Sequence, residues 1–273
     1  MCGCSDEDVP AADGGEMMNL NEYLLVKAFE CAEYRDQFNK GDIYLKSVSY
    51  YWNSENAFQQ DKEGSIFQQE GRGYLIRAND DFKAILDKSS SLDDIIRHMD
   101  SEKAGEIISE TKDFFIRLDG YLCCFYLLPK SVVSFTSNTL SIRSEHERNN
   151  LAEFLNRYGS ESRTHDFYVS IYDAFTLCNV FIKGMSDKGY NAAYSQVSYK
   201  DIDMATKIAL FQKGDYNSII FTKPTKYSYQ KEFRFFFSKP NEPIKEHITV
   251  GSIDIEKSRF GSFDYANLVS LRK

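Results

Sequence analysis

The alternation of apolar and polar positions predicts several strands in this chain. The run GYLCCFYLL at 120–128 is continuously apolar and stops at Pro129, which is typical of a strand that is covered on both faces. Shorter apolar or alternating segments, bounded by polar residues or glycine, have the lengths of strands. These predicted strands lie at 42–52, 73–78, 166–172, 196–202 and 248–255, and 131–143 is a candidate for one more.

Apolar residues at helical spacing predict helices between these strands. In the first of them, 19–41, Tyr23, Leu24 and Phe29 recur at spacings compatible with an amphipathic helix, and Gly41 follows as a stop. Asn79 and Ser91, each ahead of acidic residues, indicate N-caps for two of the segments. The remaining predicted helices lie at 79–87, 91–118, 144–159, 173–189 and 203–215.

Strands and helices are intermixed in this order without a strict βαβ alternation. The predicted fold class is therefore α+β, with a mixed, mostly antiparallel sheet flanked by helices in a single domain over residues 18–273. Residues 1–17 are acidic, rich in small residues and without a hydrophobic pattern. We predict a disordered tail there, without the basic start and apolar centre of a signal peptide.

Composition excludes some classes of protein and favours a cytoplasmic setting. The formal net charge of −8 argues against general binding to nucleic-acid backbones, which requires a basic face. No apolar run approaches the length of a membrane-spanning helix, so no membrane partner is expected. The six cysteines contain no pair of C-x-x-C units, which makes a zinc ribbon an unfavoured interpretation.

The segment YSYQKEFRFFF, residues 227–237, combines six aromatic residues with an embedded Glu-x-Arg. Read as one strand, it places Glu232 and Arg234 on the same face, with Phe233 and Phe235 on the opposite, core face. One interpretation is a surface ion pair on a half-solvated sheet. The other is a pocket floor, where Arg234 would hold an anion and Glu232 would orient a hydroxyl or stabilise a cation.

A second polar cluster follows the aromatic segment at Tyr50, Tyr51 and Trp52. Asp61 and Glu63 lie in the polar stretch behind these rings, and they are candidates for metal ligands or acid–base groups. Neither a neighbouring histidine nor a calcium-loop spacing accompanies them. A solvated acidic loop is the alternative interpretation of the same residues.

The order of these features is similar to a broad group of uncharacterised bacterial and phage proteins. Shared features are an early G-x-I-Y strand at 41–44, the acidic loop at 61–64, Tyr199, Lys223 and a late Y-x-x-E-x-R pattern at 229–234. The resemblance covers about residues 20–255. It implies prokaryotic or phage origin, a cytoplasmic setting, a role in phage–host or mobile-element conflict, and one shared site for the two polar clusters.

Three functions fit these observations. The first is an accessory or interaction protein without catalysis, because no standard catalytic motif is present. The second is an NAD-using transferase that resembles ADP-ribosyltransferases, in which Glu232 is the essential acid of a late strand. Tyr50, Tyr51 or Trp52 would then stack on nicotinamide and Arg234 would meet phosphate. The early Arg or His of that superfamily has no clear match here.

The third function is a metal-dependent nuclease or phosphoesterase that uses Asp61, Glu63 and Glu232. The acidic net charge and the lack of a histidine near these carboxylates disfavour it. The sequence names no cofactor. A protein partner or a nucleotide is the expected binding partner.

Overall fold

The computed structural model describes most of the chain between residues 18 and 264. The described residues are 18–48, 50, 66–78, 105–117, 120–136, 139–162, 167–202, 206–207, 210, 213–239 and 242–264.

The central element is an eight-stranded sheet in the order β13-β2-β5-β1-β8-β14, with β12 pairing β5 and β9 pairing β12. All of its ladders are antiparallel. Its strands are β1 (Tyr23–Phe29), β2 (Ile43–Ser47), β5 (Tyr121–Pro129), β8 (Tyr168–Asp173), β9 (Asn191–Gln196), β12 (Glu232–Ser238), β13 (His247–Val250) and β14 (Arg259–Asp264). Outside this sheet, β10 (Ser198–Tyr199) and β11 (Thr222–Lys223) form a short parallel pair. The predicted α+β fold with a mostly antiparallel sheet is therefore confirmed.

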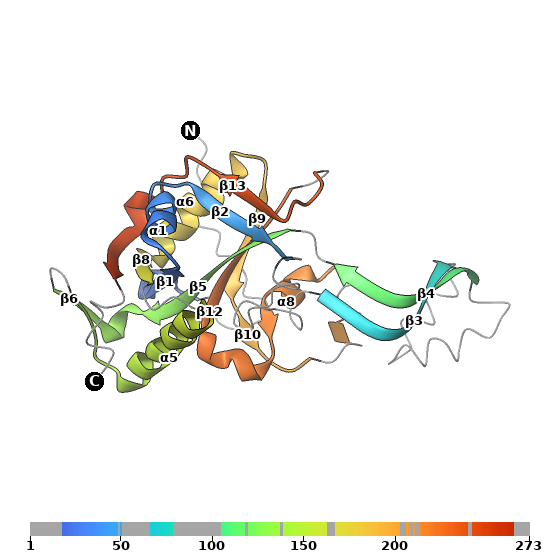
Figure 1. The fold of residues 1–273 in the computed structure, drawn as a ribbon, viewed down its shortest axis with the longest axis horizontal. Helices are drawn as coiled ribbons and strands as arrows, with labels where there is room; N and C mark the ends of the chain where they lie inside the picture. Colours follow the sequence, from blue (N-terminus) through green and yellow to red (C-terminus); the bar gives the residue numbers. More distant parts are fainter. Residues whose placement is uncertain are drawn as a thin grey trace.

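Helices cover both faces of this sheet, as Figure 1 shows for the region around β5. On one face, α1 (Ala32–Asn39) and α6 (Ala174–Ser186) pack on the alternate residues Leu25, Phe125 and Phe235. On the other face, α5 (Glu145–Ser162) packs on the residues between them, such as Val26 and Tyr126. The double cover explains why β5 is apolar without alternation.

A split in the sheet lies beside the middle of β5. β12 pairs with β5 along residues 121–126, so it occupies one edge of that strand. On the other edge, β2 pairs at residues 121–122 and β1 pairs at residues 126–129. Because β1 and β2 meet opposite ends of β5, residues 123–125 face a gap between the two strands on that edge.

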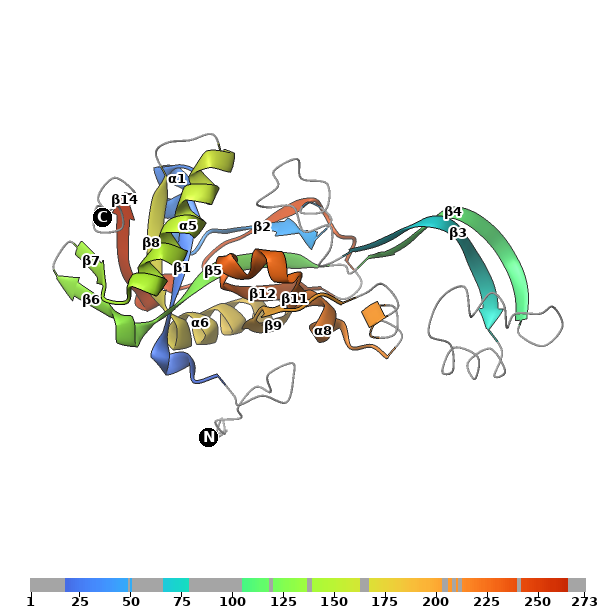
Figure 2. The same cartoon turned by 90° about the horizontal axis from the view of Figure 1, so that it is seen from below.

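Smaller elements lie outside the main sheet. β3 (Ile66–Ala78) and β4 (Gly105–Arg117) form a two-stranded antiparallel ribbon that extends to one side of the sheet (Figure 2). β6 (Val133–Thr136) and β7 (Thr139–Ile142) form an antiparallel pair that precedes α5 in the chain. The helix α8 (Tyr216–Ile220) and four 3₁₀ turns complete the described elements, the turns being Leu20–Glu22, Lys130–Val132, Thr225–Gln230 and Ile255–Ser258.

The helix predicted at 19–41 is wrong in its first half. Residues 23–29 form strand β1, and α1 begins only at Ala32. Leu24, Leu25 and Val26 are all buried, because β1 runs between β5 and β8 under helices on both faces. Apolar residues that are buried on both faces give the same sequence pattern in a strand as in a buried helix.

Other element predictions also change. The helix predicted at 91–118 is wrong over residues 105–117, which form strand β4. Residues 91–104, like the helix predicted at 79–87, lie outside the described residues. Residues 225–230 form a 3₁₀ turn, so the late strand begins at Glu232 and not at Tyr227. Lys231, at a left-handed φ of 39°, separates turn from strand. The predicted strands at 42–52, 196–202 and 248–255 are shorter than expected.

The tail predicted at 1–17 lies outside the described residues, and the single domain over 18–273 stays a prediction. Among the helices in the described parts of the chain, none combines the length and the apolar character needed to span a membrane.

Gly41 connects α1 to β2 in a conformation that tolerates no side chain. Its φ is +89°, and a Cβ at this position would lie 1.9 Å from the Ile253 carbonyl oxygen. We predict that Gly41→Ala lowers the free energy of unfolding by more than the ~1–2 kcal/mol of left-handed backbone strain alone. Gly214→Ala is the control, because Gly214 has a φ of +72° and open space around it. Urea unfolding measures both, and equal losses would contradict this prediction.

Candidate functional site

Glu232 begins strand β12 and is buried, with 6% of its surface exposed. Both of its carboxylate oxygens are engaged. Arg234 Nε donates to Oε1 at 2.8 Å, and Lys223 Nζ donates to Oε2 at 2.8 Å. The surface ion pair on a half-solvated strand, one of the two interpretations of the sequence, is therefore wrong.

The neighbours of Glu232 come from separate segments of the chain. Lys223, on β11, also donates to the Gln230 side-chain oxygen at 2.9 Å. Arg234 is 1% exposed, and its Nη1 donates to the Ile220 carbonyl at the end of α8 at 2.5 Å. The Glu232 backbone N–H donates to the Tyr199 hydroxyl, on β10, at 2.8 Å. Glu232 and its two cationic partners thus join β10, β11, α8 and the 3₁₀ turn to the main sheet.

The electrostatics of this cluster keep Glu232 ionised. Burial alone would raise the pKa of its carboxyl group, but the charges of Arg234 and Lys223 outweigh burial and hold that pKa well below its usual range. The pKa values of two neighbouring neutral groups are raised instead of lowered. Burial, with the Glu232 charge added, raises the pKa of the Cys124 thiol and of the Tyr199 hydroxyl. Glu232 is therefore a poor proton acceptor, and it holds cations in place.

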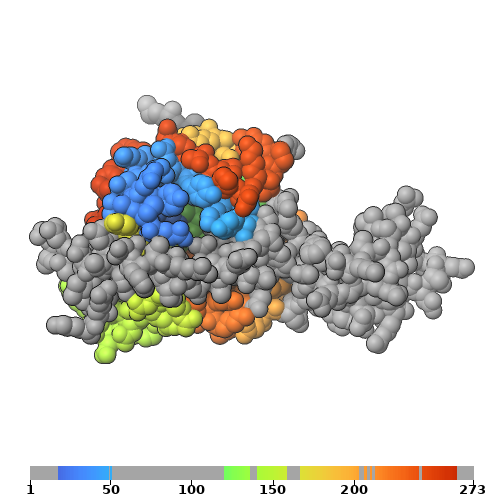
Figure 3. Space-filling model, in the orientation of Figure 1, coloured from blue at the N-terminus to red at the C-terminus, as the bar shows by residue number. Residues whose placement is uncertain are grey.

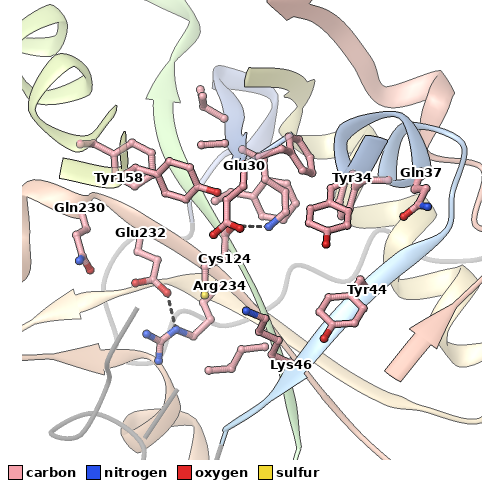
Figure 4. Close-up of a pocket in the computed structure, with 18 of the residues that line it drawn as sticks. Glu30, Tyr34, Gln37, Tyr44, Lys46, Cys124, Tyr158, Gln230, Glu232 and Arg234 are labelled. Carbon is pink, nitrogen blue, oxygen red and sulfur yellow. Dashed lines mark hydrogen bonds and ion pairs between the residues drawn. The ribbon is translucent and has the colours of Figure 1, made fainter. Parts of the chain in front are cut away.

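A cavity of about 460 Å³ lies beside this cluster. Its lining comes from six strands and from helices α1 and α5. Figure 4 shows Glu232 and Arg234 pointing to each other at one end, with Tyr34 and Tyr44 at the other. The lining residues that matter here are Lys27, Glu30, Tyr34, Asp42, Tyr44, Lys46, Cys124, Lys223, Glu232, Arg234 and Thr249.

The cavity lies where the sheet is split. Residues from β1 and from β2 line it together with Cys124 and Phe125, which face the gap from β5. In the space-filling view, the blue segment with α1 and β2 and the orange-red segment with β13 form one side of the molecule, and α5 lies on the opposite side (Figure 3). The two sides contribute opposite walls of the same cavity.

Only part of the predicted site lies within the described residues. Glu232 and Arg234 come together as expected, in the pocket rather than on the surface. Tyr50 accepts a hydrogen bond from Lys46 Nζ at 2.8 Å, and its ring lies 4.0 Å from the same ammonium. Tyr51, Trp52, Asp61 and Glu63 lie outside the described residues, so their roles stay predictions. Within the described part of the chain, no group of three His, Cys, Asp or Glu side chains is arranged to hold a metal ion.

Sequence reasoning missed the roles of several residues that build the site. Tyr199 and Lys223 are part of the pattern shared with the resembling proteins, and that pattern was the only signal for them. Cys124 had no signal as a site residue, because it lies inside an apolar strand. The signal for Lys27 was a single lysine within an apolar segment. A lysine in the middle of a buried strand was itself the unusual feature, since buried lysines normally require a partner.

Comparisons with protein-family models, with curated proteins and with solved structures found no match for this chain. The function must therefore be inferred from the site itself.

Glu232→Gln removes the carboxylate charge and keeps the side-chain shape. Arg234 and Lys223 then remain buried opposite a neutral amide, and breaking such a buried pair costs about 3–5 kcal/mol. We predict a loss of this size in the free energy of unfolding, measured with urea at pH 7. Glu153→Gln is the matched control, because its pair with Arg157 is about half exposed, and it is expected to change stability by less than about 0.5 kcal/mol. A small loss for Glu232→Gln would contradict the buried network.

The same ion pairs predict a pH dependence. The pKa of Glu232 is lowered from its usual 4.5, so the stabilisation is complete above that value and is lost as the pH falls below it. We expect the difference in unfolding free energy between wild type and Glu232→Gln to be constant above about pH 5 and to narrow toward pH 2. Urea titrations at several pH values measure it. A difference independent of pH would contradict the lowered pKa.

Proposed function

We propose that the protein is a non-enzymatic accessory protein that binds a nucleotide in the cavity at the split of the sheet. One observation is the main support: a buried, ion-paired cluster around Glu232 forms the wall of an aromatic-lined cavity of about 460 Å³. Small-molecule sites have volumes of about 300–1,000 Å³ and combine apolar lining with a few fixed polar groups. An ion-pair cluster serving stability alone would not require a cavity beside it.

The chemical groups around the cavity match the three parts of a nucleotide. The ammonium groups of Lys27 and Lys46 suit phosphate, whereas Arg234 is ion-paired with Glu232 in the wall. The carboxylates of Glu30 and Asp42 are acceptors for ribose hydroxyl groups. Aromatic side chains of the lining offer surfaces on which a base can stack. A ligand with an anion, hydroxyl groups and a flat ring uses all of them.

The contacts of Glu232 favour binding over catalysis. An essential acid of an NAD-using transferase needs an oxygen directed at the developing cation, but both Glu232 oxygens are held by Arg234 and Lys223. Its low pKa also makes it a weak general base. Glu232 is therefore best understood as a positioning residue for the two cations.

The expected setting in phage–host or mobile-element conflict stays a prediction, as do the two enzymatic alternatives. Each alternative has its own readout. An ADP-ribosyltransferase-like protein would release nicotinamide from NAD. A metal-dependent phosphoesterase would be stabilised by Mg²⁺ or Mn²⁺ in the absence of any nucleotide.

The proposal is tested by thermal unfolding with the four ribonucleoside 5′-monophosphates and with NAD. A ligand present at 100 times its dissociation constant adds about 2.7 kcal/mol, so at least one nucleotide is expected to raise the melting temperature by several degrees. Absence of any shift with all of these nucleotides would overturn the proposal. A shift with metal ions alone would favour the phosphoesterase instead.

A blocking variant shows whether the shift comes from this cavity. Thr249 lies on the exposed side of β13 and lines the cavity, so Thr249→Trp narrows it without replacing a core residue. We expect this variant to melt like the wild type without ligand and to lose the nucleotide shift. Lys245→Trp, on a neighbouring exposed residue outside the lining, is the control. A shift that survives Thr249→Trp would place binding elsewhere.

A further inference from the structure

Lys27 occupies an unusual place in the sheet. It is the one charged residue of β1, YLLVKAF, which is otherwise apolar or aromatic. Its register opposite Ser170 assigns it to the face that α1 and α6 cover. On that face its ammonium lies 4.9 Å from the ring centre of Phe125, 5.5 Å from that of Phe38 and 5.9 Å from that of Phe29.

The gap in the sheet makes this ammonium part of the cavity. Lys27 Nζ donates to the Cys124 carbonyl at 3.2 Å, on the stretch of β5 that lies between the ends of β1 and β2. The cavity itself extends over the opposite face of the sheet, where Cys124, Glu232 and Arg234 lie. Lys27, Phe38 and Phe125 therefore form its floor, reached through the gap.

The partners of Lys27 differ from those of the other cations in the lining. Lys223 and Arg234 each form an ion pair with Glu232, and Lys46 donates to Tyr50. Among the described residues, no carboxylate lies within ion-pair distance of Lys27. Its contacts are the Cys124 carbonyl, the neutral Cys123 thiol and three aromatic rings, which attract a cation without neutralising it. An ammonium backed by an apolar core strongly favours an anion on its open side.

Two tyrosines line the cavity at the end away from Glu232. Tyr34 on α1 is 56% exposed and Tyr44 on β2 is 50% exposed. Figure 4 shows both rings on this side. Burial raises the pKa of the Tyr44 hydroxyl and Tyr34 contributes to the rise, which is consistent with two neighbouring side chains. Exposed aromatic rings at a cavity are suitable stacking surfaces for a planar base.

We propose that Lys27 binds the phosphate of the nucleotide over the gap in the sheet, while the base stacks on Tyr34 or Tyr44. This inference rests on the proposed function and adds the orientation of the ligand. The ligand class is a nucleoside monophosphate or the corresponding part of a larger nucleotide. The phosphate gains most of its binding free energy from one ammonium, whereas Glu232 holds Arg234 and Lys223 in the adjoining wall.

The test compares each nucleoside monophosphate with its nucleoside by isothermal titration calorimetry. In the wild type, the monophosphate is expected to bind at least about tenfold more tightly, equivalent to ~1.4 kcal/mol. Lys27→Met removes the charge and is expected to abolish this difference while nucleoside binding stays unchanged. Lys27→Arg restores a cation and most of the difference. Lys188→Met, in the exposed turn after α6 and outside the lining, is the matched control.

A second variant keeps the test decisive if Lys27→Met fails to fold. Tyr34→Ala changes an exposed helical residue, so folding is expected to be unaffected. Tyr44→Ala is the corresponding change on β2. At least one of the two variants should weaken nucleoside and nucleotide binding by the same factor, because it removes stacking and leaves the phosphate contact. In the wild type, inorganic phosphate should compete with the monophosphate and leave nucleoside binding unaffected.

The outcomes separate this inference from the proposed function. If nucleotides bind in the cavity but Lys27→Met and the Lys188→Met control have the same affinity, the assignment of Lys27 is wrong and the proposed function stands. If the nucleoside and the monophosphate bind to the wild type with equal affinity, the proposal that Lys27 binds the phosphate is overturned. If no nucleotide binds to the wild type, the proposed function itself fails.

Discussion

The buried carboxylate of Glu232 is the interaction on which the arrangement of this site depends. Arg234 of the same strand and Lys223 of β11 meet it at 2.8 Å each, and Arg234 in turn holds the end of α8 through the Ile220 carbonyl. Removing one member leaves buried charge without compensation, which costs far more than a surface pair. Strands β10 and β11, helix α8 and the 3₁₀ turn Thr225–Gln230 are therefore held to the main sheet by these polar contacts in addition to apolar packing.

The split beside β5 is the second constraint, and it follows from hydrogen-bond satisfaction. Buried carbonyl groups at a sheet edge require donors, and a neighbouring strand normally supplies them. Where β1 and β2 diverge, the Lys27 ammonium donates to the Cys124 carbonyl instead. A side chain thus completes the edge of β5 and leaves space that a strand would have filled, and this space contributes to the cavity.

The two constraints place charge and aromatic surface around one volume. On the wall, the ion pairs of Glu232 hold Arg234 and Lys223 in fixed positions. On the floor, Phe38 and Phe125 surround the ammonium of Lys27. An ammonium held in place in this way binds an anion without first losing side-chain freedom, which is a general advantage in ligand recognition.

Sequence patterns predicted much of the fold where an element was unambiguous. The apolar run of β5, the helices α5 and α6 and strand β8 lie close to where the pattern put them. Errors arose where burial removed the alternation, as in β1, or where tertiary packing overrode local preference, as in the 3₁₀ turn before β12. A pattern of apolar residues reports burial, and it does not distinguish a helix from a strand when all sides are covered.

For the candidate site, the sequence by itself determined that Glu232 and Arg234 share a face, because residues two apart in a strand always do. It also determined that Phe233, Phe235 and Phe237 form the opposite, core face. Only the tertiary structure decided that the polar face is buried, since the covering segments come from distant parts of the chain. It alone brought Lys223 to Glu232, and Lys27 to the gap beside Cys124. The first contact spans nine residues across a 3₁₀ turn and the second spans 97, and both depend on how strands pair and pack, which no local pattern encodes.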